Sequence, residues 1–142
     1  SNHDVWLTYG QYEEFPRGNL GICRPIAHYI IDKRLYRQEP WITSHLRTFY
    51  AGLFKKINKE DLLDSDGNFY LVTWDQAFMF PMLEMAHGRI QFIDSTSYVY
   101  NMANPLNDFK KDVRKQLRTE REIRRKKPYQ PLSSIDADFV VS

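Results

Sequence analysis

The strongest constraint in the sequence is the segment AFMFPMLEMA at positions 77–86, which is apolar on nearly every helical face. A helix of this kind is buried on all sides, because it has no polar face to turn towards water. The preceding residues 73–76, Thr-Trp-Asp-Gln, match the capping box that starts a helix, and His87-Gly88 provides a stop. Pro81 removes one backbone hydrogen bond and predicts a kink. The other elements must therefore surround one central helix.

The bulk properties are those of an ordinary globular chain. Its 142 residues fit one domain, and 42% hydrophobic with 27% charged residues argues against disorder. Aromatic residues make up 15% of the chain, which favours extensive burial, a stacking surface for sugars or bases, or both. No apolar run approaches the ~18 residues that span a bilayer, and no signal peptide is visible. Cys23 is the only cysteine, which fits a reducing cytoplasm or the cytoplasmic face of a membrane.

Hydrophobic periodicity predicts the elements before the central helix. Residues 5–9 form a strand that ends at Gly10 and that residues 11–15 extend or pair with, and residues 16–40 are mostly loop. Apolar residues at spacings of three and four predict a helix over residues 41–57, capped by Thr43 or Ser44.

After the central helix, residues 89–93 and 98–101 are strand-like and predict two strands or a loose hairpin. Pro105 starts a last helix, which becomes solvated beyond Arg118. Its apolar stripe consists of Leu106, Phe109, Val113 and Leu117. The resulting fold class is α/β, with a short mixed sheet packed by about three helices. Residues 1–2 resemble a tag scar, residues 3–127 form the domain, and residues 128–142 are a tail without an assigned element.

Asp75 is the acidic residue best placed for chemistry. It lies in the first turn of the central helix, where the positive end of the helix dipole favours an ionised carboxylate, the state that a general base needs. Aspartate is also favoured in any first helical turn, so position alone does not establish catalysis. His45 and Arg47 lie on the polar side of the preceding predicted helix, where Arg47 could meet a phosphate and where ordinary surface polarity is the simpler interpretation.

Several kinds of site are absent from the sequence. There is no glycine-rich phosphate loop, no nucleophile elbow and no zinc-ligand spacing. Asp64-Ser65-Asp66 resembles the D-x-D pair that holds a metal in many glycosyltransferases, but it lies in a Gly/Asn-rich turn rather than at the end of an apolar strand. No metal ligand is therefore assigned in this chain.

Positive charge is concentrated near the C-terminus. Between Asp108 and Lys127 there are ten Lys or Arg and four Asp or Glu, in a chain whose net charge is only +2. This basic arm predicts, as an alternative function, binding to nucleic acid or to another anionic surface. No aromatic platform is interleaved with it, and a solvated helix end is the simpler interpretation.

Four segments, in order, resemble the C-terminal half of family 2 glycosyltransferases of the GT-A type. They are VWLTYGQYEEFPRGNLG, SHLRTFYAGLFKKI, WDQAFMFPMLEMA and YVYNMANPLND, which together extend from Val5 to about Asn107. The resemblance implies a partial GT-A fold and an enzyme that moves a sugar from a nucleotide-sugar donor to a hydroxyl of a glycan or another acceptor, with inversion.

The resemblance also implies roles for individual residues. Asp75 takes the position of the base that deprotonates the acceptor hydroxyl. Many relatives have Glu-Asp where this chain has Trp74-Asp75, so Trp74 is expected either to stack on a sugar face or to pack against the core. In the family the donor-binding half, with its Mn²⁺ or Mg²⁺ site, precedes the matched stretch. We therefore expect the divalent metal in the full-length enzyme, not in this segment, and no transferase activity from this segment by itself.

A purely structural or interaction domain remains the alternative that requires neither sugar transfer nor nucleic-acid binding. Strands that belong to a larger sheet leave exposed edges, which predicts self-association into a homo-oligomer through those edges.

Overall fold

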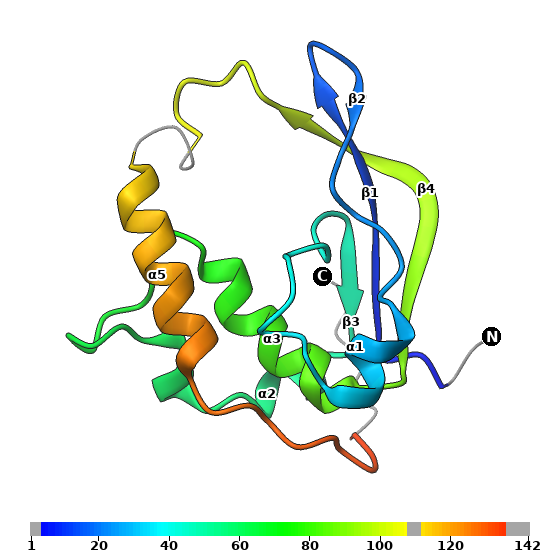
Figure 1. The fold of residues 1–142 in the computed structure, drawn as a ribbon, viewed down its shortest axis with the longest axis vertical. Helices are drawn as coiled ribbons and strands as arrows, with labels where there is room; N and C mark the ends of the chain where they lie inside the picture. The colour runs from blue at the N-terminus through cyan, green and yellow to red at the C-terminus, as the bar shows by residue number, and fades with distance from the viewer. Residues whose placement is uncertain (1–3, 108–111, 136–142) are drawn as a thin grey trace.

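The computed structural model describes residues 4–107 and 112–135, and it is organised around the expected buried helix (Figure 1). This helix, α3 (Trp74–Ala86), buries every residue from Gln76 to Ala86 except Phe78. His87, at its C-terminus, has a positive φ of 47°, so the predicted stop is confirmed. The described residues contain mixed α and β structure, and no helix among them is long and apolar enough to cross a membrane.

The capping box predicted at the start of α3 does not form. Thr73 has φ 51° and ψ 20°, in the left-handed region, whereas a side-chain cap requires an extended residue at this position. Within the described residues, the Thr73 hydroxyl is buried and has no hydrogen-bond partner. The backbone N–H of Gln76 instead donates to the Thr73 carbonyl and to Oδ1 of Asp75.

Strand β1 (Leu7–Phe15) is the centre of a mixed sheet. Strand β4 (Ile90–Asn101) runs parallel to it, from the pair Leu7–Ile90 to the pair Phe15–Asn101. Strands β3 (Arg47–Phe49) and β2 (Asn19–Leu20) pair antiparallel with the first and last parts of β1. Of the two alternatives for residues 11–15, extension of the first strand is confirmed, because β1 continues past Gly10. The predicted gap within residues 89–101 is wrong, because β4 is continuous. Pairing along β1 keeps β4 extended through its polar middle, with a register shift opposite Gly10.

The helix predicted over residues 41–57 is also wrong. Residues 41–46 are irregular, residues 47–49 form β3, and only α2 (Ala51–Lys55) is helical. The segment is rich in β-branched and aromatic residues, which tolerate extended structure. The edge of β1 at Leu7–Tyr9 offers backbone hydrogen-bonding groups, and pairing with them decides the local structure against the helical period.

The loop regions are ordered by short elements. Helix α1 (His28–Lys33) forms within the stretch predicted to be mostly loop, and a 3-10 helix, η1 (Lys59–Leu62), precedes the polar turn at residues 64–68. In that turn Oδ1 of Asp64 accepts hydrogen bonds from the backbone N–H groups of Asp66 and Asn68, at 2.9 and 3.0 Å. Gly67 has φ 80°, so the predicted turn is confirmed.

The last helix differs from its prediction in both its start and its buried face. Helix α5 (Val113–Arg125) begins after Asp112, whose side chain accepts the Lys115 N–H. Of the predicted stripe, Phe109 lies outside the described residues and the other three side chains are exposed. The buried face is instead Thr119 and Ile123, so the helix does not become solvated beyond Arg118.

Contacts with the core explain why the C-terminal part of α5 is fixed. The Arg37 guanidinium donates to the Ile123 carbonyl, and Arg124 donates to the carbonyls of Arg37 and Glu39. The tail then continues over the core, where the Leu132 N–H donates to the Met85 carbonyl. Figure 1 shows α3 between the sheet and α5, and α3 contacts both.

Candidate functional site

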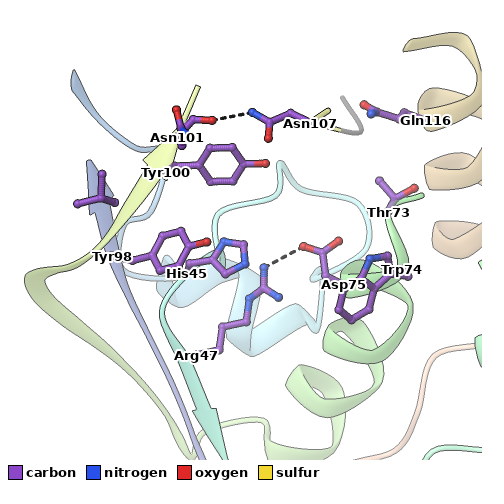
Figure 2. A pocket seen from close by; sticks show the side chains of 11 residues that line it. His45, Arg47, Thr73, Trp74, Asp75, Tyr98, Tyr100, Asn101, Asn107 and Gln116 are labelled. Atoms are coloured by element: carbon purple, nitrogen blue, oxygen red, sulfur yellow. Dashed lines mark hydrogen bonds and ion pairs between the residues drawn. The ribbon is translucent and has the colours of Figure 1, made fainter. Parts of the chain in front are cut away.

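A pocket of about 450 Å³ opens at the N-terminal end of α3, between β4, β3 and α5 (Figure 2). All four site residues predicted from the sequence line it, although they come from two separate segments of the chain, residues 45–47 and 74–75. The complete lining is His45, Arg47, Thr73, Trp74, Asp75, Tyr98, Val99, Tyr100, Asn101, Asn107 and Gln116.

Asp75 is held by two hydrogen bonds. Its Oδ2 accepts from Nη2 of Arg47 at 2.8 Å, and its Oδ1 accepts from the Gln76 backbone N–H at 3.0 Å. Charge-assisted pairing of this kind is short and directional, and it fixes the orientation of the carboxylate. Because each carboxylate oxygen has two lone pairs, both oxygens can still accept a proton or a hydrogen bond from the pocket.

Arg47 lies in different surroundings from those predicted. It is on β3 rather than on a helix, and its side chain is only 8% exposed. Nε donates to the Thr43 carbonyl at 3.1 Å, and the guanidinium lies 5.6 Å from the Trp41 ring centroid and 6.0 Å from that of Phe78. The structure therefore shows Arg47 as the partner that orients Asp75, and it does not show a guanidinium presented to solvent for a phosphate.

His45 contributes a neutral imidazole. Its ring stacks on Tyr98, with centroids 4.7 Å apart and an interplanar angle of 18°, and Nδ1 lies 3.2 Å from the Ser44 hydroxyl. Burial lowers the pKa of His45, Arg47 lowers it further, and Asp75 partly opposes them. At neutral pH this imidazole can donate one hydrogen bond and accept another.

Aromatic rings make up the walls of the pocket. Tyr98 and Tyr100 lie two residues apart on β4, so their side chains leave the same face of the strand. Trp74 is 56% exposed, with its ring centroid 5.5 Å from that of Phe78. This exposure excludes full burial of Trp74 in the core and leaves the indole accessible for stacking.

Amide side chains line the part of the pocket between β4 and α5 (Figure 2). Nδ2 of Asn107 donates to the Asn101 carbonyl at 2.8 Å, which ties the loop after β4 to the end of the strand. Gln116 reaches the same pocket from α5. Sequence reasoning gave no role to these amides or to the two tyrosines. The alternation in Tyr98-Val-Tyr100 was the one local signal that could have identified the rings.

The chemistry of this lining is suited to a polyhydroxylated ligand. Aromatic rings pack on the apolar C–H faces of sugars, and planar carboxylate and amide groups form directional hydrogen bonds with hydroxyls. Asp75 and His45 are the two groups that can accept a proton from such a ligand at neutral pH.

The described residues do not provide a metal centre. No group of three His, Cys, Asp or Glu among residues 4–107 and 112–135 is arranged to hold an ion. Asp64 uses one carboxylate oxygen to close its own turn. Comparisons with protein-family models, with curated proteins and with solved structures find no match to this chain.

Proposed function

We propose that this chain is the acceptor-binding part of an inverting glycosyltransferase of the GT-A type, with Asp75 as the general base. The observation that carries the proposal is the convergence of Asp75, Trp74, His45 and Arg47 on one pocket, with the rings of Tyr98 and Tyr100 beside His45. The sequence resemblance points to the same aspartate through different evidence. The mixed sheet around β1 is then one part of a larger GT-A sheet.

The proposed reaction begins with an acceptor hydroxyl hydrogen-bonded to a free lone pair of Asp75. As that oxygen forms its bond to the anomeric carbon of the donor sugar, the proton passes to Asp75. The bond from the anomeric carbon to the diphosphate breaks at the same time, and its electron pair leaves with the nucleoside diphosphate. Attack opposite the leaving group inverts the anomeric centre.

The surrounding residues support this role for Asp75. The Arg47 pair orients the carboxylate before the acceptor arrives, so that reaction requires little rearrangement. Trp74 and Tyr98 provide exposed ring faces on which a sugar can stack. A general base in this position contributes about 10²–10⁴-fold to the rate.

Mn²⁺ or Mg²⁺, which the resemblance implies for the whole enzyme, would neutralise charge on the diphosphate when bound. The donor set of the described residues does not fit such an ion. No step of the proposed reaction therefore passes through a metal held by this chain. We expect this chain by itself not to turn over nucleotide sugars with either ion, and measurable turnover would contradict that expectation.

The test compares Asp75→Asn with Asp66→Asn. Asp66 is a carboxylate in the 64–68 turn and does not line the pocket, so its isosteric amide is a matched control. Sugar binding to this chain is followed through the indole NMR signal of Trp74, and transfer is measured in the longest natural polypeptide that contains this segment. Asp75→Asn is expected to lower transfer at least ~100-fold while the protein remains folded. Normal transfer in Asp75→Asn would remove Asp75 from the mechanism.

A second candidate function rests on α5. Its exposed arginines are spaced by four, three and four residues, so they form one stripe along the helix. This stripe, Arg114, Arg118, Arg121 and Arg125, suits nucleic acid or another anionic surface. Salt-sensitive binding of RNA, DNA or anionic vesicles that the double change Arg118→Glu/Arg121→Glu abolishes would support it, and no binding at low salt would exclude it.

A further inference from the structure

A second, apolar groove lies beside the candidate site. It has a volume of about 420 Å³ and is lined mainly by aromatic and aliphatic side chains, including Phe49, Phe54, Leu62, Phe69, Trp74 and Phe78. Its volume is in the range of small-molecule sites. Phe69 is 59% exposed although it is a large apolar side chain, and exposed apolar surface of this kind marks sites of interaction.

Trp74 connects the groove to the candidate site. Its side chain lines both cavities, and the next residue in the chain is Asp75. Because Asp75 and Trp74 line the same pocket, a ligand with a hydroxyl at Asp75 can also contact the indole of Trp74. Figure 2 shows Trp74 and Asp75 side by side at the start of α3. The two cavities therefore meet at Trp74.

The candidate site has a polar lining and the groove has an apolar one, which matches the polar and apolar ends of an amphipathic molecule. The candidate site presents charged, imidazole and amide groups around its rings, whereas the groove presents mostly carbon. Its rings pack on one another, with Phe54 and Phe78 centroids 6.0 Å apart and Phe49 and Phe54 centroids 6.3 Å apart. This packing holds the wall of the groove in place without a ligand.

We propose that the acceptor is amphipathic, with its reacting hydroxyl end at Asp75 and an apolar alkyl or aryl group in the groove beyond Trp74. This inference rests on the proposed function of the Asp75 pocket and adds the chemical class of its substrate. Trp74 stacks on the sugar or linker at the junction between the two ends.

The test uses three probes with the whole 142-residue chain: octyl β-glucoside below its micelle concentration, methyl β-glucoside, and 1-octanol. Dissociation constants are measured from the Trp74 indole signal. Octyl β-glucoside is expected to bind at least about tenfold more tightly than methyl β-glucoside, because burial of two methylene groups is sufficient for that factor. It is also expected to bind more tightly than 1-octanol.

Phe69→Ser is the groove variant, and Leu20→Ser is its control. Both residues are mostly exposed, and Leu20 lines neither cavity. Phe69→Ser is expected to remove most of the preference for the octyl chain and to leave methyl β-glucoside binding unchanged. Leu20→Ser is expected to keep the preference.

The outcomes separate this inference from the proposed function. Equal affinity for the two glucosides, or a preference that survives Phe69→Ser, overturns the groove assignment. If methyl β-glucoside binding is still weakened by Asp75→Asn in that case, the sugar site stands without the groove. If 1-octanol binds as tightly as octyl β-glucoside and Asp75→Asn has no effect, the amphipathic acceptor is refuted and the sugar site loses its support.

Discussion

Asp75 and Arg47 set the electrostatics of the candidate site at the scale of single residues. The acid is partly open to the pocket, whereas the guanidinium is almost fully buried among Trp41 and Phe78. A buried cation without its anion is costly, so the two residues depend on each other for stability as well as for orientation.

Arg47→Met is expected to lower the free energy of unfolding by about 2 kcal/mol, less than the loss for a fully buried pair because Asp75 is partly exposed. Urea denaturation measures the change. The double variant Arg47→Met/Asp75→Asn is expected to lose less stability than the sum of the two single variants, because each change removes the same interaction. Additive losses would show that the pair contributes no coupling.

His45 predicts a dependence of stability on pH. Burial holds its pKa in the folded protein below the value of about 6.5 for an unperturbed histidine. As the pH falls through 6.5, the unfolded chain therefore binds a proton before the folded chain does, and stability is lost. His45→Gln is expected to lose less stability than wild type between pH 7.5 and pH 5.5. Equal losses in chemical denaturation at the two pH values would contradict this assignment.

The sequence identified the residues of the site better than it identified their surroundings. Asp75 was selected because the start of a helix is a local pattern, whereas Trp74 was selected only through the family resemblance. His45 and Arg47 were assigned to the site but placed on a helix. Arg47 is instead on β3, which exists only through pairing with β1, and His45 lies in the irregular segment just before it. Tyr98 and Tyr100 face the pocket because β4 runs parallel to a strand more than eighty residues earlier in the chain, and no local pattern specifies that pairing.

At the scale of elements, α5 shows how tertiary contacts select the face of a helix. The sequence offers an apolar stripe that includes Val113 and Leu117, yet the helix packs through Thr119 and Ile123. The hydrogen bonds from Arg37 and Arg124 anchor its C-terminal part, which fixes the rotation of the helix. Hydrophobic periodicity alone could not reveal these bonds, because their partners are backbone carbonyls.

Two alanine substitutions, one on the buried face of α5 and one on its exposed face, test this orientation of the helix. Ile123→Ala, at a side chain that is 1% exposed, is expected to cost about 2–4 kcal/mol of stability. Leu117→Ala, at a side chain that is 50% exposed, is expected to cost less than about 1 kcal/mol. Thermal and urea unfolding measure both. If Leu117→Ala lost more stability than Ile123→Ala, the helix would pack through the apolar stripe predicted from the sequence and not through Thr119 and Ile123.

At the scale of the whole molecule, a buried ion pair joins segments that are distant in sequence. Nη2 of Arg37 lies 2.6 Å from Oε1 of Glu84, and the two side chains are 3% and 2% exposed. Arg37 also binds the carbonyls of Ile123 and Lys126, and the Tyr129 N–H donates to Glu84. The pair thus connects the segment after α1 with α3, α5 and the tail, and it fixes the helices that surround the candidate site.

Glu84→Gln is expected to cost about 3 kcal/mol, because Arg37 stays buried without its counter-charge. The control is Glu120→Gln, which breaks the partly exposed pair with Arg124 on α5 and is expected to cost less than about 1 kcal/mol. Equal losses in urea denaturation would show that the Arg37–Glu84 pair does not organise the fold.

The edge of the sheet predicts self-association. Strand β4 pairs with β1 along one edge, and no second strand among the described residues pairs with its other edge. Its side chains are mostly exposed, and a strand edge of this length without a neighbouring strand offers N–H and C=O groups to a strand of another chain. Sedimentation velocity is expected to show dimers that increase with concentration. Ile93→Lys is expected to shift the equilibrium towards monomer, since a lysine on an edge strand disfavours pairing. A monomer at every concentration would mean that the β4 edge is protected within this chain. The proposed larger GT-A sheet could then not add a further strand at β4, and that proposal would lose this support.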